Sequence, residues 1–405
     1  MASNDNALDD SDRLVVVLQE DRVVIRQSPG GTSDASNVQS ITITVDDDYR
    51  EITEDGIRYL EELLALYTNV EYINMERLTH AITTIPVSAL VRLLQVENVR
   101  RISDLRILGS NLQGTVREWQ QLAHVVRDNL LSLQFICIVE PLAWLAHIPL
   151  RALDPLVRVC ASHPTLKFVA TNLFGGVSLE AIDDFCRSPQ IMGLHLVDID
   201  VSSERVYRFL HQMKFNSKAW FLSMAFAKTI TTSHGQALAE LLHHNKMIAN
   251  LSIKSKRPLQ EGFLVELVKG LDNSASMLDE LSLEGAGDKS LVISQSCRTA
   301  IANMLERNKR LHTLILEEVE SKGLTDEIDM FMNLNRAGRR NLLSGHATTV
   351  ASSQEWLDAL SHDFVTNDLS CIYYLLCKNP ELVCPQRKPN QPLLTRKRKR
   401  LHVSS

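Results

Sequence analysis

The sequence has few aromatic residues, no paired cysteines and no long hydrophobic run, and each absence excludes a class of protein. Phe, Trp and Tyr make up only 5% of the 405 residues, although hydrophobic residues together make up 44%. The seven cysteines include no Cys-x-x-Cys pair, so we expect reduced, mostly buried thiols in a cytosolic or nuclear protein. No segment approaches the ~20 apolar residues of a membrane span, and the acidic start of the chain predicts no secretory signal peptide.

Charge is distributed unevenly along the chain. The net charge is −6, from 43 Lys and Arg against 49 Asp and Glu. Seven of the basic residues and no acidic residue lie in 383–405, so the rest of the chain has 36 basic against 49 acidic residues, a net charge of −13. A general nucleic-acid binder needs a basic body, so this distribution argues against nucleic acid as the main partner.

A helix–turn–strand pattern recurs in the second half of the chain. Residues 235–253 and 299–316 each read as a short amphipathic helix, an Asn, a turn and a strand of alternating apolar residues. Asn245 and Asn308 each lie three residues before one apolar residue and six before another. A unit that recurs at a fixed period is typical of a solenoid, in which each repeat packs on its neighbours.

Further candidate strands extend this pattern over residues 41–318, and segments with helical apolar spacing lie between them. The last five strand anchors are 28, 29, 30 and 33 residues apart: Leu194, Leu222, Leu251, Leu281 and Leu314. This spacing is long enough for one strand and one helix in each repeat.

The apolar pattern resembles that of the leucine-rich-repeat family, in its long ribonuclease-inhibitor-like class. The family strand pattern is Leu-x-x-Leu-x-Leu-x-x-Asn/Cys-x-Leu. Its first three apolar positions are occupied twice over: Ile248, Leu251 and Ile253, then Leu311, Leu314 and Leu316. Other residues occupy the position of the family's Asn or Cys, which predicts degenerate repeats: Lys256, Ala286 and Val319. The resemblance implies an α/β horseshoe solenoid with a curved parallel sheet inside, helices outside and a helical C-terminal cap.

The chain outside the repeats divides into shorter segments. Residues 1–12 are polar and predicted to be disordered, and β-branched runs within 13–40 predict a hairpin cap followed by a loop. We expect the repeats to occupy 41–322. Amphipathic helical patterns in 323–382 predict a cap, because a solenoid needs a cover over its last apolar face. Residues 383–405 read as a disordered basic tail.

The sequence contains no motif for catalysis, cofactors or metals. The segment 283–290 lacks the Gly that a phosphate-binding loop has before its Lys, and Asp288 in that place would repel phosphate. His243 and His244 are adjacent and would diverge on a helix, and the Cys and His residues lack the spacing of structural zinc ligands. We therefore expect a protein that is not an enzyme and has no cofactor.

The inner face of the predicted sheet is the candidate surface for a protein partner. Residues that alternate with the buried anchors point to this face. They are of mixed polarity: Arg106, Gln134, His195, Phe221, Ser223, Ser252, Lys254, Ser282, Glu284, Ile315 and Glu317. Exposed Phe221 and Ile315 would suit a protein interface, whereas a register shift of one residue would place Phe221 in the core.

Five consecutive basic residues form a second candidate site: Arg396, Lys397, Arg398, Lys399 and Arg400. Such a run is typical of a nuclear-import signal recognised by an import receptor or of a nucleic-acid contact, and the alternative is a solvated tail with no role. We expect a cytoplasmic and/or nuclear protein.

The resemblance implies a protein-interaction scaffold whose partner is unknown. Two other functions are alternatives. A GTPase-activating protein for a small nuclear-transport GTPase would supply a catalytic Arg or an ordered Asn, and no matching motif is found. A substrate-recognition subunit of a ubiquitin ligase would need an F-box-like helical segment, whereas residues 13–40 read as a β hairpin.

Overall fold

The computed structural model describes the greater part of the repeat region and little of the chain beyond residue 336. The described residues are 13–19, 22–27, 38–45, 52–77, 84–108, 111–139, 151–172, 177–199, 204–271, 276–285, 291–317, 319–320 and 324–336. The chain divides into two compact units, Met1–Ile328 and Asp329–Ser405. The repeats lie in the first unit, which is described here by itself. Most of the predicted cap (323–382) and all of the predicted tail (383–405) lie outside the described residues, so the predicted domain boundaries stay predictions.

One large sheet runs through the described part of the first unit, and its strands follow one another in chain order from β3 onward. The twelve strands are β1 (Arg13–Gln19), β2 (Arg22–Gln27), β3 (Ser40–Val45), β4 (Tyr72–Arg77), β6 (Asp104–Leu108), β8 (Phe135–Val139), β9 (Phe168–Thr171), β10 (Gly193–Ile199), β11 (Phe221–Phe226), β12 (Asn250–Ser255), β13 (Glu280–Gly285) and β15 (Thr313–Leu316). Neighbouring strands pair in parallel, except for β1 and β2, which form an antiparallel hairpin with β2 at the edge of the sheet.

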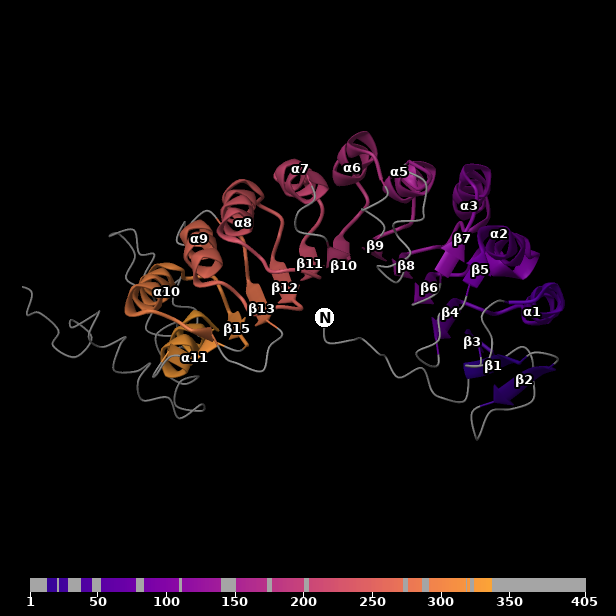
Figure 1. The fold of residues 1–405 in the computed structure, drawn as a ribbon, viewed down its shortest axis with the longest axis horizontal. Coiled ribbons are helices and arrows are strands. Elements are labelled where there is room, and N and C mark those ends of the chain that lie inside the picture. Colours follow the sequence, from indigo (N-terminus) through magenta and orange to yellow (C-terminus); the bar gives the residue numbers. More distant parts are fainter. Residues whose placement is uncertain are drawn as a thin grey trace, which may run out of the picture. The chain divides into compact units, whose positions relative to one another are not determined.

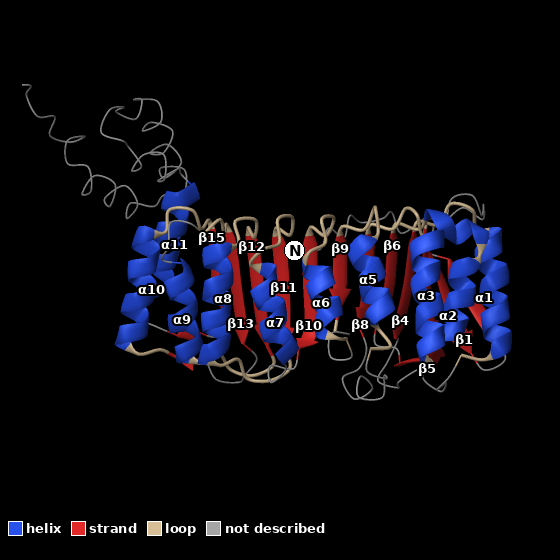
Figure 2. Ribbon diagram, turned by 90° about the horizontal axis from the view of Figure 1, so that it is seen from above, coloured by secondary structure: helices blue, strands red, loops and turns tan. Residues whose placement is uncertain are grey.

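A helix follows each strand from β3 onward. The helices are α1 (Glu54–Leu66), α2 (Val87–Gln95), α3 (Val116–Asn129), α5 (Asp154–Ser162), α6 (Leu179–Cys186), α7 (Glu204–Met213), α8 (Thr232–His244), α9 (Glu261–Leu271), α10 (Gln295–Arg307) and α11 (Leu324–Arg336), with a short 3-10 helix η3 (Glu97–Arg101) after α2. Two small sheets pair β5 (Thr84–Pro86) with β7 (Asn111–Gln113) and β14 (Leu291–Val292) with β16 (Val319–Glu320). Within the first unit, the sheet is curved, with helices α1 to α10 on its outer side (Figure 1), and all of these helices cover the same face (Figure 2). The predicted fold class, an α/β leucine-rich-repeat solenoid, is confirmed.

Two rows of side chains on the helix-facing side of the sheet form the core, and all of them are apolar except Thr171. The first row is Ile41, Ile73, Leu105, Ile136, Val169, Leu194, Leu222, Leu251, Leu281 and Leu314. The second row is Ile43, Met75, Ile107, Ile138, Thr171, Leu196, Met224, Ile253, Leu283 and Leu316. All are buried except Leu316, which is half-buried. The five predicted strand anchors belong to the first row, and full burial of each aliphatic side chain contributes roughly 1.5–3 kcal/mol.

Buried polar side chains connect the turns that lead from each helix into the next strand. The side-chain Nδ2 of Asn245 donates to the carbonyl oxygens of Met213 (2.6 Å) and Asn216 (3.0 Å) in the preceding repeat. Its Oδ1 accepts from the backbone N–H groups of Met247 (2.7 Å) and Ile248 (3.0 Å). Two other residues make the same kinds of bond: Asn216 and Asn308. The recurrent Asn found in the sequence therefore satisfies backbone groups of two adjacent repeats at the strand entrances.

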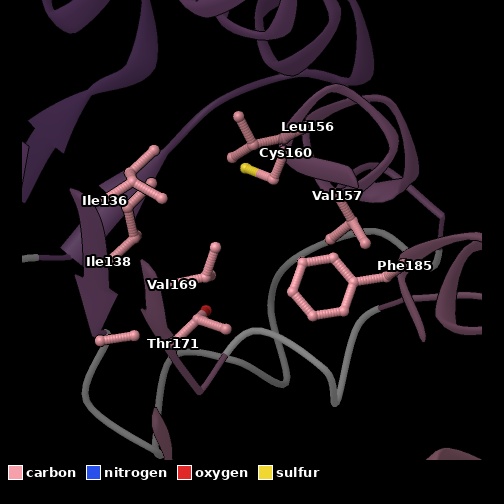
Figure 3. Close-up of a pocket in the computed structure, with 9 residues that line it drawn as sticks. Ile136, Ile138, Leu156, Val157, Cys160, Val169, Thr171 and Phe185 are labelled. Atoms are coloured by element: carbon pink, nitrogen blue, oxygen red, sulfur yellow. The ribbon is translucent and has the colours of Figure 1, made fainter. Parts of the chain in front are cut away.

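A small cavity lies between the sheet and the helices at the middle of the solenoid (Figure 3). Its lining comes from β8, β9, α5 and α6: Ile136, Ile138, Leu156, Val157, Cys160, Val169, Ala170, Thr171 and Phe185. The volume is about 30 Å³, which is enough space for a water molecule. A buried water needs two to four polar partners, and this lining is almost entirely apolar. The cavity is therefore a packing defect in the core.

Candidate functional site

The structure places the predicted surface residues of the strands on the inner face of the sheet, opposite the helices. One cross-strand row contains His195, Ser223, Ser252, Ser282 and Ile315. Ile315 is 43% exposed, Ser223 is buried, and the other three are half-buried. This row therefore presents small polar groups and one apolar side chain.

The remaining predicted residues on the later strands surround that row. Lys254 and Glu284 are paired in register and form an ion pair, with 2.6 Å between Nζ and Oε2. Glu317 is exposed directly after β15. Gln134 is exposed, but it precedes β8, and Phe135 takes the inner-face position on that strand.

Phe221 lies on the inner face by register, yet it is only 6% exposed. Its strand neighbours Leu222 and Met224 point to the core and are fully buried. The expectation that the Phe221 ring is open to solvent is therefore wrong, and so is the alternative that a register shift places it in the core. The ring of Trp220 packs edge-to-face against it, with 6.1 Å between ring centroids.

Phe221 belongs to an aromatic cluster on the inner face of β8 to β11. The first inner row places Phe135, Phe168, Gly193 and Phe221 on adjacent strands. Trp220, at the entrance to β11, packs edge-to-face on Phe168 with 6.4 Å between ring centroids. Phe135, Phe168 and Trp220 are half-buried, so part of each ring is open to a partner. We call Phe135, Phe168, Trp220 and Phe221 the aromatic cluster.

The missing side chain of Gly193 lets these rings come together. A Cβ atom on Gly193 would lie 2.3 Å from Cδ1 of Phe168 and 3.4 Å from Cδ1 of Phe221. The Phe168 ring therefore lies over the backbone of β10, which carries no side chain at this position. Any larger residue would push the ring away from the sheet.

Arg106 borders the aromatic cluster at β6. Its guanidinium carbon lies 5.1 Å from the ring centroid of Phe135, a cation–π arrangement. Its Nε donates to Oδ1 of Asp104 (3.0 Å) and its Nη2 donates to Oδ2 (2.9 Å). Burial raises the pKa of the Asp104 carboxyl, and Arg106 opposes this shift. The Arg106 guanidinium is therefore already paired with the Asp104 carboxylate, and this border of the cluster has almost no net charge.

Carboxylates border the cluster on its other side, at β13. In the row that contains Phe221, the next residues are Asn250 and Glu280, and Asn250 Nδ2 donates to Glu280 Oε2 (3.0 Å). Asp279 precedes Glu280, and its Oδ1 lies 2.6 Å from Nδ1 of His312. Neighbouring strands are ~4.8 Å apart, so Glu280 lies about 10 Å from Phe221 along the row.

Met192 extends the apolar surface to the edge where the strands begin. It is 37% exposed, and its carbonyl oxygen accepts from the N–H of Trp220 (2.9 Å). These two residues occupy equivalent positions in adjacent repeats. The aromatic cluster is therefore accessible from this edge of the sheet as well as from the inner face.

The described inner face combines partly open aromatic rings with polar and charged side chains. No group of three or more His, Cys, Asp or Glu among them is placed to hold a metal ion. Burial lowers the pKa of His195 on the inner face. Burial also raises the pKa of the Cys137 thiol to about 12, so this thiol stays protonated at neutral pH. In the part of the chain that the structure covers, no helix is long and apolar enough to span a membrane.

Sequence reasoning missed most of the aromatic cluster, although a positional signal was present. Phe135, Phe168 and Phe221 each lie two residues after the first apolar residue of their repeat, and Gly193 occupies the same position. An alignment of the repeats at this position would have shown the aromatic row. The predicted import residues Arg396, Lys397, Arg398, Lys399 and Arg400 lie outside the described residues.

Comparison with known proteins shows likeness of fold only. No family model matches the chain, and no curated protein matches it. Similar solved structures include leiomodin-1 actin-binding site 2, at 20% identity, with 40% of this chain and 89% of that chain covered and a TM-score of 0.33. The tropomodulin C-terminal domain of Caenorhabditis elegans is 15% identical, with 40% and 96% covered and a TM-score of 0.33. A protein of Bacteroides fragilis is 13% identical, with 63% and 66% covered and a TM-score of 0.40. At these identities and TM-scores we take no function from them.

Proposed function

We propose that this protein is a non-enzymatic scaffold for protein–protein interaction, and that its partner binds the inner face of the sheet over the aromatic cluster. The partly open rings of Phe135, Phe168 and Trp220 are the observation that carries this proposal. Aromatic residues are enriched at protein interfaces and supply a large share of their binding energy. Phe168 and Trp220 are already packed against each other on a rigid sheet. Little side-chain entropy is therefore lost when a partner binds.

The residues predicted from the sequence form the polar surroundings of this proposed site. A typical interface has an apolar centre and a polar, solvent-accessible rim. We assign the rim to His195, Ser252, Lys254, Ser282, Glu284 and Glu317, with the buried Ser223 in the same row and the apolar Ile315 on β15. Changes at the rim should weaken binding less than changes in the aromatic cluster, because solvent screens its charges.

We further propose that the repeats belong to the ribonuclease-inhibitor-like class. The support is local: one helix follows each strand from β3 onward. The alternatives of a GTPase-activating protein and of a ubiquitin-ligase subunit are favoured by no observation on the described residues. The first would need an Arg that can reach a partner's active site, whereas Arg106 on the inner face is bound by Asp104 and lies over Phe135. The second would need a helical N-terminal segment, whereas the described segments before β3 form a hairpin.

For the basic run at Arg396–Arg400 we propose nuclear import through an import receptor, which places the protein in the cytoplasm and/or the nucleus. The support is the run itself, within a segment of seven basic and no acidic residues. The basic run lies apart in sequence from the inner-face site, so the two proposals are tested separately.

Site-specific photo-crosslinking in the native cell tests the scaffold proposal. A benzophenone amino acid at position 220 or 192 should give a discrete crosslinked product with the partner, whereas the same group at Leu66, which is 68% exposed on α1, should not. Adding Phe168→Ser to the position-192 variant should reduce the yield by about tenfold or more, as expected for a residue at the centre of an interface. Equal crosslinking from all three positions would contradict the proposal.

A further inference from the structure

We infer that the segment bound by the aromatic cluster is an amphipathic helix that lies across the strands and carries Lys or Arg at the end nearest β13. This inference deepens the proposed function and rests on it. It follows from two features of the inner face: the spacing of the aromatic row and the unequal charge at its two ends.

The spacing of the row matches a helix better than an extended chain. The row runs from β8 to β11, with one strand every ~4.8 Å. A helix rises 5.4 Å per turn, so a helix across the strands presents about one apolar residue to each strand, at i, i+3 or i+4, and i+7. Residues on one side of an extended segment are roughly 6.7 Å apart. This spacing exceeds the distance between strands, so the side chains of an extended segment would not stay aligned with the row. Binding of an apolar helical face in a hydrophobic groove is a common mode of recognition.

The charges at the two ends of the row differ. At β6, Arg106 is neutralised by Asp104. From β12 to β15, Asp279, Glu280, Glu284 and Glu317 outnumber the basic side chains Lys254, which is paired with Glu284, and His312, which is paired with Asp279. The β13 end is therefore acidic, and a partner gains from basic residues there. Glu280 lies about 10 Å beyond Phe221, which corresponds to roughly two turns of helix beyond the last apolar contact.

The same charges argue against other occupants. A single-stranded nucleic acid would use the aromatic rings but needs a basic groove along its backbone, and the borders here are neutral and acidic. An acidic helix would meet like charge at Asp279 and Glu280. Charge complementarity of this kind mainly determines specificity and association rate, so exchange of charge should change which peptide binds.

Titration of the full chain with three labelled 18-residue peptides tests the inference by fluorescence anisotropy. The first peptide carries Leu at i, i+3, i+7 and i+10 on a helical face and four Lys at one end. The second replaces the Lys residues by Glu. The third has the sequence of the first except for two central Pro residues, which prevent a helix. The first should bind at least about tenfold more tightly than either of the others.

Variants of the protein connect this preference to the site. Trp220→Ser should weaken binding of the first peptide at least about tenfold. The double variant Asp279→Lys and Glu280→Lys should reverse the preference, so that the Glu peptide binds more tightly. The matched control is Glu62→Lys and Glu97→Lys, which changes the net charge equally at two exposed positions on the helix side and should preserve the preference. Far-UV circular dichroism checks that each variant is folded.

The outcomes separate this inference from the proposed function. If the Lys and Glu peptides bind equally and both respond to Trp220→Ser, the aromatic site stands and the basic partner is wrong. If the Pro-containing peptide binds as well as the first, the helical partner is wrong. If the control double variant also reverses the preference, attraction to the whole acidic body explains the binding. If no peptide responds to Trp220→Ser, the proposed site itself is contradicted.

Discussion

At the level of single residues, buried polar side chains such as Asn245 link adjacent repeats by hydrogen bonds to their backbones. The amide of Asn245 satisfies two carbonyl oxygens and two N–H groups, and it is 2% exposed. We expect Asn245→Ala to lower the free energy of unfolding by roughly 2–4 kcal/mol, because buried backbone groups lose their partners. Urea denaturation measures this change. Asn303→Ala, at an exposed position on α10, is the control and should have little effect. An equal effect of both substitutions would show that the bonds of Asn245 contribute nothing.

His163 occupies the position equivalent to Asn245, three residues before a buried apolar residue, and should make stability depend on pH. Burial lowers the pKa of His163, although the carbonyl groups of Val126 and Leu130 oppose this shift. The unfolded chain, with a His pKa of about 6.5, then binds more protons than the folded chain. Stability is therefore present above about pH 6.5 and is lost as pH falls from there toward the folded pKa.

His163→Asn should flatten this pH dependence. Each unit of pKa shift corresponds to about 1.4 kcal/mol, and the Asn amide can donate to carbonyl oxygens of the preceding repeat as Asn245 does. Urea denaturation of both proteins between about pH 7.5 and about pH 5.5 measures the slopes, since these values lie about one unit either side of the His reference pKa. Some slope should remain, since burial also lowers the pKa of His195. Identical slopes would show that His163 does not cause the effect.

At the scale of single elements, the packing between β9 and the helices α5 and α6 is incomplete. Val169 is 5% exposed and lines the cavity of about 30 Å³ beneath these helices (Figure 3). Val169→Ile adds one methylene group at the cavity wall, so we expect the unfolding free energy to rise by about 0.5–1 kcal/mol. Thermal and urea denaturation measure the gain.

A valine elsewhere in the core gives the matched control for this substitution. Val126 on α3 is fully buried and does not line the cavity. Val126→Ile should destabilise the protein by about 1 kcal/mol or more, because extra volume in a well-packed core forces strain. A loss of stability in Val169→Ile would mean that the added methylene group does not fit into the cavity.

At the scale of the whole molecule, the predicted tail and the repeats carry charge of opposite sign. The segment 383–405 has seven positive charges, while the rest of the chain has a net charge of −13. Salt at ~0.15 M screens exposed charges beyond about 8 Å, so we expect attraction to the body to leave the tail accessible to an import receptor. Alanine at all five positions from Arg396 to Arg400 should move a bulky fluorescent fusion from the nucleus to the cytoplasm. Microscopy of matched wild-type and variant fusions measures the shift, and identical distributions would contradict import.

Much of the fold could be predicted because its main signal repeats. Leu194, Leu222, Leu251, Leu281 and Leu314 recur at intervals of about 30 residues, and the structure places them in one buried row. Each strand position on the inner face then follows from alternation along the strand. The site was harder to predict, because the exposure of a side chain depends on its neighbours in space: Phe221 is on the inner face, yet it is only 6% exposed.

The sequence by itself determined the solenoid, since a short strand and a helix with one apolar side each can bury those sides only by stacking on copies of themselves. It also indicated the core residues of the last five strands of the row, from Leu194 to Leu314. Only the tertiary structure decided that Phe168 and Trp220, from different repeats, form one surface. They meet because Gly193 lies between their strands without a side chain, and the repeat period shows which positions are equivalent but not which side chains meet across an empty one.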